Sequence, residues 1–340
     1  MCIALIATSH PKYALIVLDN RDEYVLRPTS RPSWWTHAES GHSVLSAVDL
    51  HRREHGTWMG ITKQGRLAVL TNYRETNCND PEHPINGVKS RGGMVTAWLG
   101  APDEQDLQDF VIKMLEGRMV KGVGGFSLIC GDLKRKGKKE IEPLAIISNR
   151  SEGLDSVPWI GGERDKVWGL SNTVYTEPAT WKKVKLGKQL LEEAIRKAVE
   201  KDLDEDELTE ALYSVLDTDT LPLKPGMKFE EFLDALQESI FVPAMDDETK
   251  SQEWRTTAES KKMKVAFNAI EDESCETIQH AGLEAPVMFD TGPYGTQRQT
   301  IILVDWEGNV TYKERALWDA DGNSIERGKG DMTFKFAVDE

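Results

Sequence analysis

The sequence predicts an α+β fold, with two stacked β-sheets between two outer layers of helices in a four-layer α-β-β-α sandwich. Three observations support this prediction. Apolar, β-rich segments lie near both ends of the chain, whereas segments with helical periodicity cluster between residues 178 and 239. The chain has no Walker sequence and no strand-linked Gly-x-Gly-x-x-Gly loop, so the phosphate loops of nucleotide enzymes are absent. The first strand also carries a candidate terminal nucleophile, Cys2.

Residues 1–6 and 13–18 are two apolar runs, and they predict a pair of central strands. Cys2 lies in the first run. Because cysteine is small, we expect removal of Met1 to make Cys2 the amino-terminal residue. A terminal cysteine combines a thiol nucleophile with an α-amino group of pKa about 7.7 to 8.0, so it carries its own general base.

A charged segment, Asn-Arg-Asp-Glu at residues 20–23, ends the second strand. Pairing of the two strands across the short turn at residues 9–12 would bring Arg21 beside Cys2. A fixed positive charge at that position would lower the pKa of the thiol. The same segment is equally compatible with a charged turn held by internal ion pairs, which contribute little to stability at a surface.

Composition restricts the class of protein. The chain has 340 residues, of which 39% are hydrophobic and 29% are charged, and we expect one globular domain spanning residues 1–340. No apolar run reaches the ~18 residues of a membrane span, and no secretory signal precedes the first strand. We therefore expect a cytoplasmic protein, with a mitochondrial or Golgi-associated location left open.

The net charge of −15 argues against a nucleic-acid partner, because neutralising phosphates requires clustered Lys and Arg. The one basic cluster, at residues 134–139, is interpreted as a solvated hairpin tip near residues 131–142. The cysteines at positions 2, 78, 130 and 275 form no Cys-x-x-Cys pair and are expected to be reduced. His51 and His55 have i,i+4 spacing, but no carboxylate pattern accompanies them, so we predict no metal site.

Residues 27–35 predict a proline-punctuated loop that ends in two adjacent tryptophans. Residues 56–62 and 66–72 then predict a hairpin with a glycine turn. This hairpin places Asn72 at a strand end, where its carboxamide could donate a hydrogen bond to a developing oxyanion. Asparagine is also a routine turn residue, so both interpretations stand.

The sequence pattern in the middle of the chain predicts two helices followed by three strands. Two helices and three strands are expected at residues 94 onwards, 103–116, 125–130, 143–149 and 167–172. Glycines at 92 and 93 open the first of these helices. The last strand ends in Asn172, and this second asparagine at a strand end strengthens the oxyanion interpretation.

Helical periodicity dominates the next part of the chain, and strands follow it. The predicted helices are 178–199, 206–216 and 228–239, and the predicted strands are 294–305, 310–317 and 332–338. Residues 245–282 are acidic and interrupted, and we interpret them as a partly mobile insertion. Acidity also predicts that the helix at 206–216 is peripheral.

Several motifs stand out across the chain. They are Met-Cys-Ile at 1–3, Asn-Arg-Asp-Glu at 20–23, Gly-Thr-Trp-Met-Gly at 56–60, Leu-Thr-Asn-Tyr at 70–73, Gly-Leu-Ser-Asn at 169–172 and the strand at 295–305. In combination they resemble the transport and Golgi organisation protein 2 family over nearly the whole chain. More distantly, the plan is similar to the N-terminal-nucleophile hydrolases, within them to the bile-salt hydrolases and penicillin V acylases.

The distant resemblance implies the four-layer fold of those hydrolases and a set of site residues. These are Cys2 as nucleophile, Arg21 beside the thiol, Asn72 and Asn172 as oxyanion donors, and Arg298 as a second active-site cation. In those hydrolases an aspartate follows the arginine at a longer spacing, whereas here Asp22 is adjacent and Glu23 comes next. The sequence leaves open which of these two carboxylates is the active-site acid.

Two functions are compatible with the resemblance. The family is linked to Golgi organisation and secretion, to mitochondria and lipid or acyl-CoA metabolism, and to haem trafficking. This favours a protein that binds a small hydrophobic ligand, haem or an acyl-CoA-like molecule, in a cleft at Cys2. The alternative is an active amide or thioester hydrolase with Cys2 as nucleophile, which would require no cofactor. Haem would then be a transported ligand only, since the chain has no Cys-x-x-Cys-His attachment motif.

Overall fold

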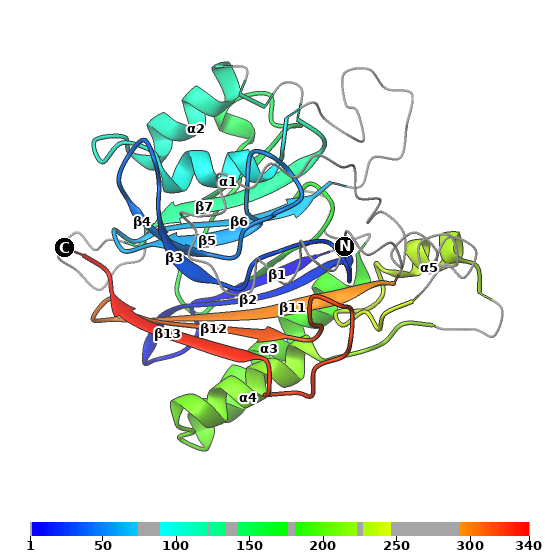
Figure 1. Cartoon of the computed structure of the whole chain (residues 1–340). Coiled ribbons are helices and arrows are strands. Elements are labelled where there is room, and N and C mark those ends of the chain that lie inside the picture. Colours follow the sequence, from blue (N-terminus) through cyan, green and yellow to red (C-terminus); the bar gives the residue numbers. More distant parts are fainter. Residues whose placement is uncertain are drawn as a thin grey trace.

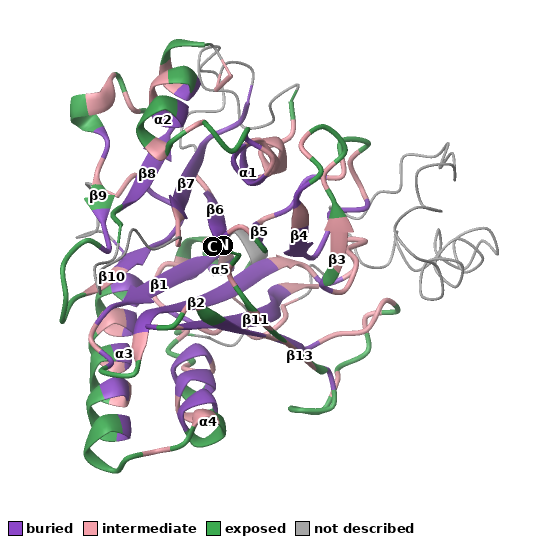
Figure 2. Ribbon diagram, turned by 90° about the vertical axis from the view of Figure 1, so that its left-hand side faces the viewer, coloured by how far each residue is buried: buried purple, intermediate pink, exposed green. Residues whose placement is uncertain are grey.

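Two antiparallel β-sheets lie face to face in the computed structural model of this protein, with helices on both outer faces (Figure 1). The structure describes residues 2–73, 89–117, 119–120, 123–133, 142–175, 181–222, 227–245 and 293–339. Figure 2 shows that buried positions concentrate in the strands of both sheets, while exposed positions lie mainly on the outer sides of helices and in loops.

The first sheet has six strands in the order β10-β1-β2-β11-β12-β13. Their bounds are β1 Ile3–Ala7, β2 Tyr13–Tyr24, β10 Val167–Leu170, β11 Tyr294–Asp305, β12 Asn309–Ala316 and β13 Asp331–Ala337. The predicted pair of β1 and β2 is present, with Ile3 opposite Asn20. On its other side β2 pairs with β11, which places Arg298 opposite Arg21. Strand β2 therefore brings together residues from both ends of the chain.

The second sheet has seven strands in sequence order from β3 to β9. Their bounds are β3 Ser33–Thr36, β4 Ser43–Ser46, β5 Met59–Thr62, β6 Arg66–Asn72, β7 Phe126–Asp132, β8 Leu144–Ser148 and β9 Trp159–Ile160. The predicted pairs β5–β6 and β7–β8 are present. The basic cluster at residues 134–139, between β7 and β8, lies outside the described residues. The loop predicted over residues 27–35 is wrong at its end, because Trp34 and Trp35 pair with β4.

Helices cover the outer faces of both sheets. Their bounds are α1 Gly92–Leu99, α2 Leu107–Glu116, α3 Lys182–Glu200, α4 Glu205–Leu216 and α5 Phe229–Ala235. Helices α1 and α2 pack on the seven-stranded sheet and α3 and α4 on the six-stranded sheet (Figure 1). This layer order confirms the predicted α-β-β-α sandwich. None of the helices in the described part of the chain combines the length and apolar character needed to cross a membrane.

Side chains of β2 alternate between two hydrophobic cores. Residues 15 and 17 pack between the sheets, whereas residues 16 and 18 pack beneath α3 and α4. Continuing this alternation directs Arg21 between the sheets and Asp22 towards the helices. Strand β1 alternates in the same way, and Ala4 and Ile6 belong to the core between the sheets. Cys2 shares their parity and therefore lies on the side of the sheet that Arg21 occupies.

The prediction that the helix at 206–216 is peripheral is wrong. Leu208, Leu212 and Leu216 of α4 are buried in the core against the six-stranded sheet. The carbonyl of Leu216 also accepts a hydrogen bond of 2.8 Å from the carboxamide of Asn20 on β2. The exposed acidic residues of α4 are Asp206, Glu207 and Glu210, whereas its leucines face the core. Acidity therefore did not indicate that the whole helix is solvated. The segment 246–282 lies outside the described residues.

Candidate active site

Cys2 directly precedes β1, and continuing the register in which Ile3 pairs with Asn20 places it across from Arg21. The residue is buried, with 4% of its surface exposed. Its thiol donates to the main-chain carbonyl of Asp22 with an Sγ–O distance of 4.0 Å. The hydroxyl of Tyr294 donates to the same carbonyl at 3.1 Å. The thiol is thus held against the end of β2 by a shared main-chain acceptor.

The pKa of the Cys2 thiol is raised to about 12, chiefly because burial disfavours the charged thiolate. The nearby carboxylates of Asp19 and Asp22 raise it further. The sequence predicted the opposite shift, through the positive charge of Arg21, and that prediction is wrong. The guanidinium of Arg21 is directed to other partners: Nη2 donates to Gln297 Oε1 at 2.6 Å, and the group lies 4.6 Å from the ring centroid of Trp58.

Arg298 on β11 pairs with Arg21 on β2. Its guanidinium nitrogens donate hydrogen bonds to groups of the surrounding fold. Its Nη1 donates to the main-chain carbonyls of Gln297 at 3.0 Å and Trp318 at 2.8 Å. Its Nε lies 3.8 Å from a carboxylate oxygen of Glu314. Burial lowers the pKa of Arg298 to about 10, and Glu314 opposes that shift. The predicted second cation therefore pairs with Arg21 in the sheet, and its donors contact groups other than Cys2.

Asp22 and Glu23 point to opposite sides of β2. The carboxylate of Asp22 accepts a hydrogen bond of 2.7 Å from the hydroxyl of Thr296 and lies 3.8 Å from Nζ of Lys183. Glu23, in contrast, lines a cavity between the sheets. The sequence left the choice of acid between these two residues, and the structure gives them different surroundings: only Asp22 contacts the Cys2 thiol, through its main chain.

Two further buried charges near Cys2 were missed by sequence reasoning. Lys183 comes from the first turn of α3, and its side chain is fully buried. Asp19 lies two residues before Arg21 on the same face of β2, and burial raises its pKa to about 7. The period of two along a strand was a signal that could have identified Asp19. No comparable signal pointed to Lys183.

Asn72 and Asn172 connect the two sheets beside Cys2. The carboxamide of Asn172 donates to the main-chain carbonyl of Asn72 at 2.5 Å. The adjacent Ser171 hydroxyl donates to the carbonyl of Cys2 at 2.7 Å. The two predicted asparagines therefore contact each other, and the neighbour of Asn172, Ser171, contacts Cys2. The carboxamide of Asn172 is used to hold the end of β6. Asn72 is half-buried and lines the cavity.

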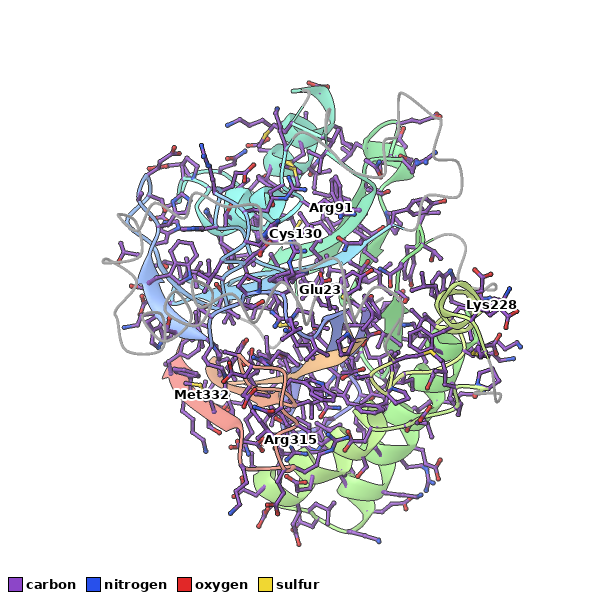
Figure 3. All side chains as sticks on the ribbon, turned by 45° about the vertical axis from the view of Figure 1, so that its right-hand side comes forward. Glu23, Arg91, Cys130, Lys228, Arg315 and Met332 are labelled. Atoms are coloured by element: carbon purple, nitrogen blue, oxygen red, sulfur yellow. The ribbon has the colours of Figure 1, made fainter. Side chains whose placement is uncertain are left out.

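The cavity beside this cluster has a volume of about 300 Å³. Its lining residues are Glu23, Arg27, Asp49, His51, Arg52, Gly56, Thr57, Trp58, Leu70, Asn72, Lys89, Ser90, Arg91 and Gly92. Arg27 is paired with Asp49 at 2.8 Å and with Glu23 at 3.7 Å. Figure 3 shows Glu23 and Arg91 near the middle of the molecule. The lining is mostly polar and charged, which differs from the apolar cleft expected for a hydrophobic ligand.

Arg91 is the cavity residue whose charge interacts with Cys2. It directly precedes α1, and its guanidinium donates to the carbonyl of Gly125 at 3.4 Å. Burial lowers its pKa, and Glu23 and a thiolate at Cys2 oppose that shift. Cys2 itself is not among the residues that line the cavity. The described residues contain no group of three or more His, Cys, Asp or Glu side chains placed to hold a metal ion.

The chain is similar to known proteins in both sequence and fold. A sequence model of the family described as Transport and Golgi organisation 2 matches residues 1–319. The human Transport and Golgi organization protein 2 homolog is 30% identical over 312 residues, covering 91% of this chain and 88% of its own. A solved variant of conjugated bile acid hydrolase from Clostridium perfringens is 10% identical, with a TM-score of 0.44 and coverage of 99% and 98%. Penicillin V acylase from Agrobacterium tumefaciens is also 10% identical, with a TM-score of 0.37 and coverage of 99% and 86%.

Proposed function

The chain belongs to the Transport and Golgi organisation 2 family, and we propose that within it this protein hydrolyses amide or thioester bonds with Cys2 as nucleophile. The family predicted from the sequence motifs is thereby confirmed. The observation that carries the proposal is the concentration of buried charge around one thiol. The buried charged residues whose charge interacts with Cys2 are Asp19, Asp22 and Lys183, and Arg21 lies beside them on β2.

Buried charge of this kind is costly for a fold. The effective penalty is several kcal/mol per ion even after partial compensation, and well-packed apolar residues would often stabilise the same site better. Charged groups with shifted pKa values collect at functional sites, where they serve chemistry rather than stability. The pKa of Asp19 is raised to about 7 and the pKa of Lys183 is lowered, both chiefly by burial. These shifts support a catalytic interpretation of the cluster.

The proposed reaction begins once Met1 has been removed. As Sγ of Cys2 bonds to the substrate carbonyl carbon, the α-amino group of Cys2 takes the thiol proton. This transfer accompanies the attack, because the raised pKa keeps the resting thiol protonated. The carbonyl oxygen becomes an oxyanion, and we assign its stabilisation to the carboxamide of Asn72. Asn172 positions Asn72 through its hydrogen bond to the main chain.

Collapse of this intermediate completes acyl transfer. The carbon–nitrogen or carbon–sulfur bond of the substrate breaks, and the leaving amine or thiol takes the proton from the α-amino group of Cys2. Water then attacks the thioester formed on Cys2, which releases a carboxylic acid and restores the thiol. We assign Asp22 to the orientation of the α-amino group, with Arg21 beside the thiol. Hydrolysis by this route requires no cofactor.

Intact-mass measurement tests the proposal. The purified chain is weighed before and after incubation with acyl p-nitroanilides and with acyl thioesters of N-acetylcysteamine. We expect a mass without Met1 and a transient acyl adduct on Cys2. Cys2→Ala should abolish the adduct, whereas Cys130→Ala, at a buried cysteine of β7, should keep it. Retention of Met1, or no adduct with any substrate of the panel, would reject the hydrolase.

A carrier of haem or of an acyl-CoA-like molecule is the second candidate. Catalysis is favoured by an accessible thiolate and a free amide donor, but the pKa of the Cys2 thiol is raised and the carboxamide of Asn172 is already engaged. A carrier needs neither group, so these two observations favour it. The charged cavity suits the carboxylates of haem or the phosphates of an acyl-CoA better than it suits an acyl chain. In an absorption titration with haem, the carrier predicts saturable binding that Cys2→Ala retains.

The cellular role we propose lies in Golgi organisation or secretion and in haem or acyl-lipid homeostasis. The name of the human relative links that protein to transport and Golgi organization. For this chain we propose a cytoplasmic location with association to mitochondria or Golgi. A fluorescent fusion expressed at native level tests the location, and a secretion assay after deletion of the gene tests the role. Normal secretion in the deletion strain would contradict it.

A further inference from the structure

Lys183 occupies a position that disfavours its charge. It is the second residue of α3, and its side chain is fully buried. Enclosing an ammonium group is costly, and the first turn of a helix repels a cation through the helix dipole. Burial accordingly lowers the pKa of Lys183. Packing alone does not account for a lysine here, because an apolar side chain would fill the same space without the cost.

The counter-ion of Lys183 is Asp22. Lys183 Nζ lies 3.8 Å from Asp22 Oδ2, and both side chains are fully buried. The hydroxyl of Thr296, on β11, donates to Asp22 Oδ1 at 2.7 Å. The carboxylate is therefore held from two directions, by α3 and by the neighbouring strand. Holding the side chain from both directions also restrains the peptide group to which it is attached.

That peptide group contacts the candidate nucleophile. The carbonyl oxygen of Asp22 accepts the Cys2 thiol, with an Sγ–O distance of 4.0 Å. Lys183 is thus connected to the sulfur through a single residue. The two groups also interact through their charges, since a thiolate at Cys2 raises the pKa of Lys183. Because opposite charges stabilise each other, a charged Lys183 favours a thiolate at Cys2, and this effect on the thiol is smaller than those of burial, the amino terminus, Asp19 and Asp22.

We infer that Lys183 is a positioning residue for Cys2: its buried ammonium holds the Asp22 segment that receives the thiol, and its charge favours an anion on the sulfur. For its part in catalysis the inference rests on the proposed hydrolase function. Its effect on the chemistry of the thiol is measurable without any substrate.

Charged groups other than Lys183 also affect the pKa of the Cys2 thiol. The charged amino terminus favours the thiolate of Cys2, whereas Asp19 and Asp22, both on β2, disfavour it. Tyr294 on β11 and Arg91 before α1 also interact with the charge of Cys2. These groups stay in place when only Lys183 is substituted. The effect of removing the Lys183 cation on thiol reactivity can therefore be measured separately from the effect of removing the Asp22 carboxylate.

The test measures how fast methyl methanethiosulfonate modifies Cys2 between pH 7 and 10, with the modified peptide quantified by mass spectrometry. We expect Lys183→Met to slow modification about tenfold at a given pH, which corresponds to a rise of about one unit in the thiol pKa. We expect Asp22→Asn to accelerate modification, because it removes a carboxylate and leaves the cation. Loosened packing would accelerate both variants, and acceleration in both would overturn the inference.

Matched variants keep the test decisive. Lys183→Arg retains the charge in a larger, planar group, so it should slow modification less than Lys183→Met does. If Lys183→Met fails to fold, the double variant Asp22→Asn with Lys183→Met removes both charges together. It should react about tenfold more slowly than Asp22→Asn alone. Equal rates for those two proteins would overturn the inference. Cys130, buried in β7, reports any general opening of the fold, and its rate should not change.

The outcomes for Lys183 and for hydrolysis are distinguishable. Slow modification in Lys183→Met together with no acyl adduct on the wild type would reject the hydrolase and keep Lys183 as a positioning residue. An acyl adduct together with unchanged modification in Lys183→Met would keep the hydrolase and reject the inference.

Discussion

Arg21 on β2 and Arg298 on β11 lie directly opposite each other, and both residues are buried. Like charges at opposite positions of a sheet repel each other, so their surroundings must compensate. Arg21 lies over the ring of Trp58 and donates to Gln297, while Arg298 lies 3.8 Å from Glu314. Glu314 on β12 is therefore the carboxylate that balances Arg298, whereas Arg21 depends on Gln297 and on the ring of Trp58.

Replacing Glu314 should destabilise the fold strongly. Its carboxylate lies 3.3 Å from Arg31 and 3.8 Å from Arg298, with 3% of its side chain exposed. Glu314→Gln leaves a buried arginine without its counter-ion, and we expect a loss of about 3 to 5 kcal/mol in the free energy of unfolding. Equilibrium unfolding in urea measures this change.

An exposed ion pair provides the control for Glu314. Lys12 and Asp202 are paired at 3.2 Å with side-chain exposures of 62% and 89%. Asp202→Asn should change the free energy of unfolding by less than about 1 kcal/mol. If the two substitutions had equal effects, the buried carboxylate would not be balancing the arginines.

The adjacent glycines at the start of α1 should respond differently to a methyl group. A Cβ on Gly92 would lie 2.8 Å from the main-chain nitrogen of Thr57, whereas a Cβ on Gly93 would meet nothing within 4 Å. Gly92 also lines the cavity. Gly92→Ala should cost about 2 kcal/mol or more, because the backbone at Gly56 must move. Gly93→Ala should be neutral or stabilise the helix by up to about 1 kcal/mol.

Thermal unfolding of the two alanine variants measures this difference. A drop in melting temperature for Gly92→Ala alone would support close packing of α1 on the loop before β5. Equal melting temperatures would contradict the close approach of Gly92 to Gly56 at the cavity wall.

The fold was largely predictable because its central strands carry their own signals. The apolar runs at 3–6, 14–18 and 301–304 are buried on both faces, and continuous apolar sequence indicates such strands. The edge strand β3 follows two prolines and has no apolar run, so its strand character comes from pairing with β4. The two-residue strand β9 is too short for any periodicity to show.

The site was predictable only where a residue type was distinctive. Cys2 and Arg21 were found through a resemblance and through strand pairing, and the structure places them opposite each other. Lys183 lies in a helix with lysines also at 182, 185 and 188, and only tertiary packing makes it the buried one. The pKa of Cys2 was wrongly predicted because burial, unlike the presence of Arg21, is not visible in the sequence.

The two asparagines should differ in what their removal affects. Asn72 is half-buried on the cavity wall, so Asn72→Ala should slow acylation of Cys2 by about 100-fold or more and leave stability nearly unchanged. Asn172 donates to the carbonyl of Asn72, so Asn172→Ala should also reduce the free energy of unfolding by about 1 to 3 kcal/mol. Burst kinetics with an N-acetylcysteamine thioester and urea unfolding measure the two effects. Unchanged acylation in Asn72→Ala would remove Asn72 from the proposed oxyanion site.

Asp19 should make stability fall as the pH rises. Burial raises its pKa in the folded protein from 3.8 to about 7. Between these values the unfolded chain has lost the proton while the folded chain retains it, so the folded state is progressively disfavoured as pH increases. Below about pH 4 both states are protonated and Asp19 has no such effect. Above about pH 7 both states are ionised, and the penalty is complete and constant.

Asp19→Asn removes this titration and should stabilise the protein at neutral and alkaline pH. One pKa unit corresponds to 1.36 kcal/mol, so the gain over the wild type should grow from nearly zero at pH 4 to about 2 to 4 kcal/mol at pH 8. Urea unfolding of both proteins across this range measures the difference, and the value at pH 4 corrects for the altered contacts of an amide. A difference that stayed constant from pH 4 to 8 would show that Asp19 titrates alike in both states. A gain that appears as predicted would mean that the wild type retains a destabilising carboxylate two residues from Arg21, which is the trade of stability for chemistry that an active site makes.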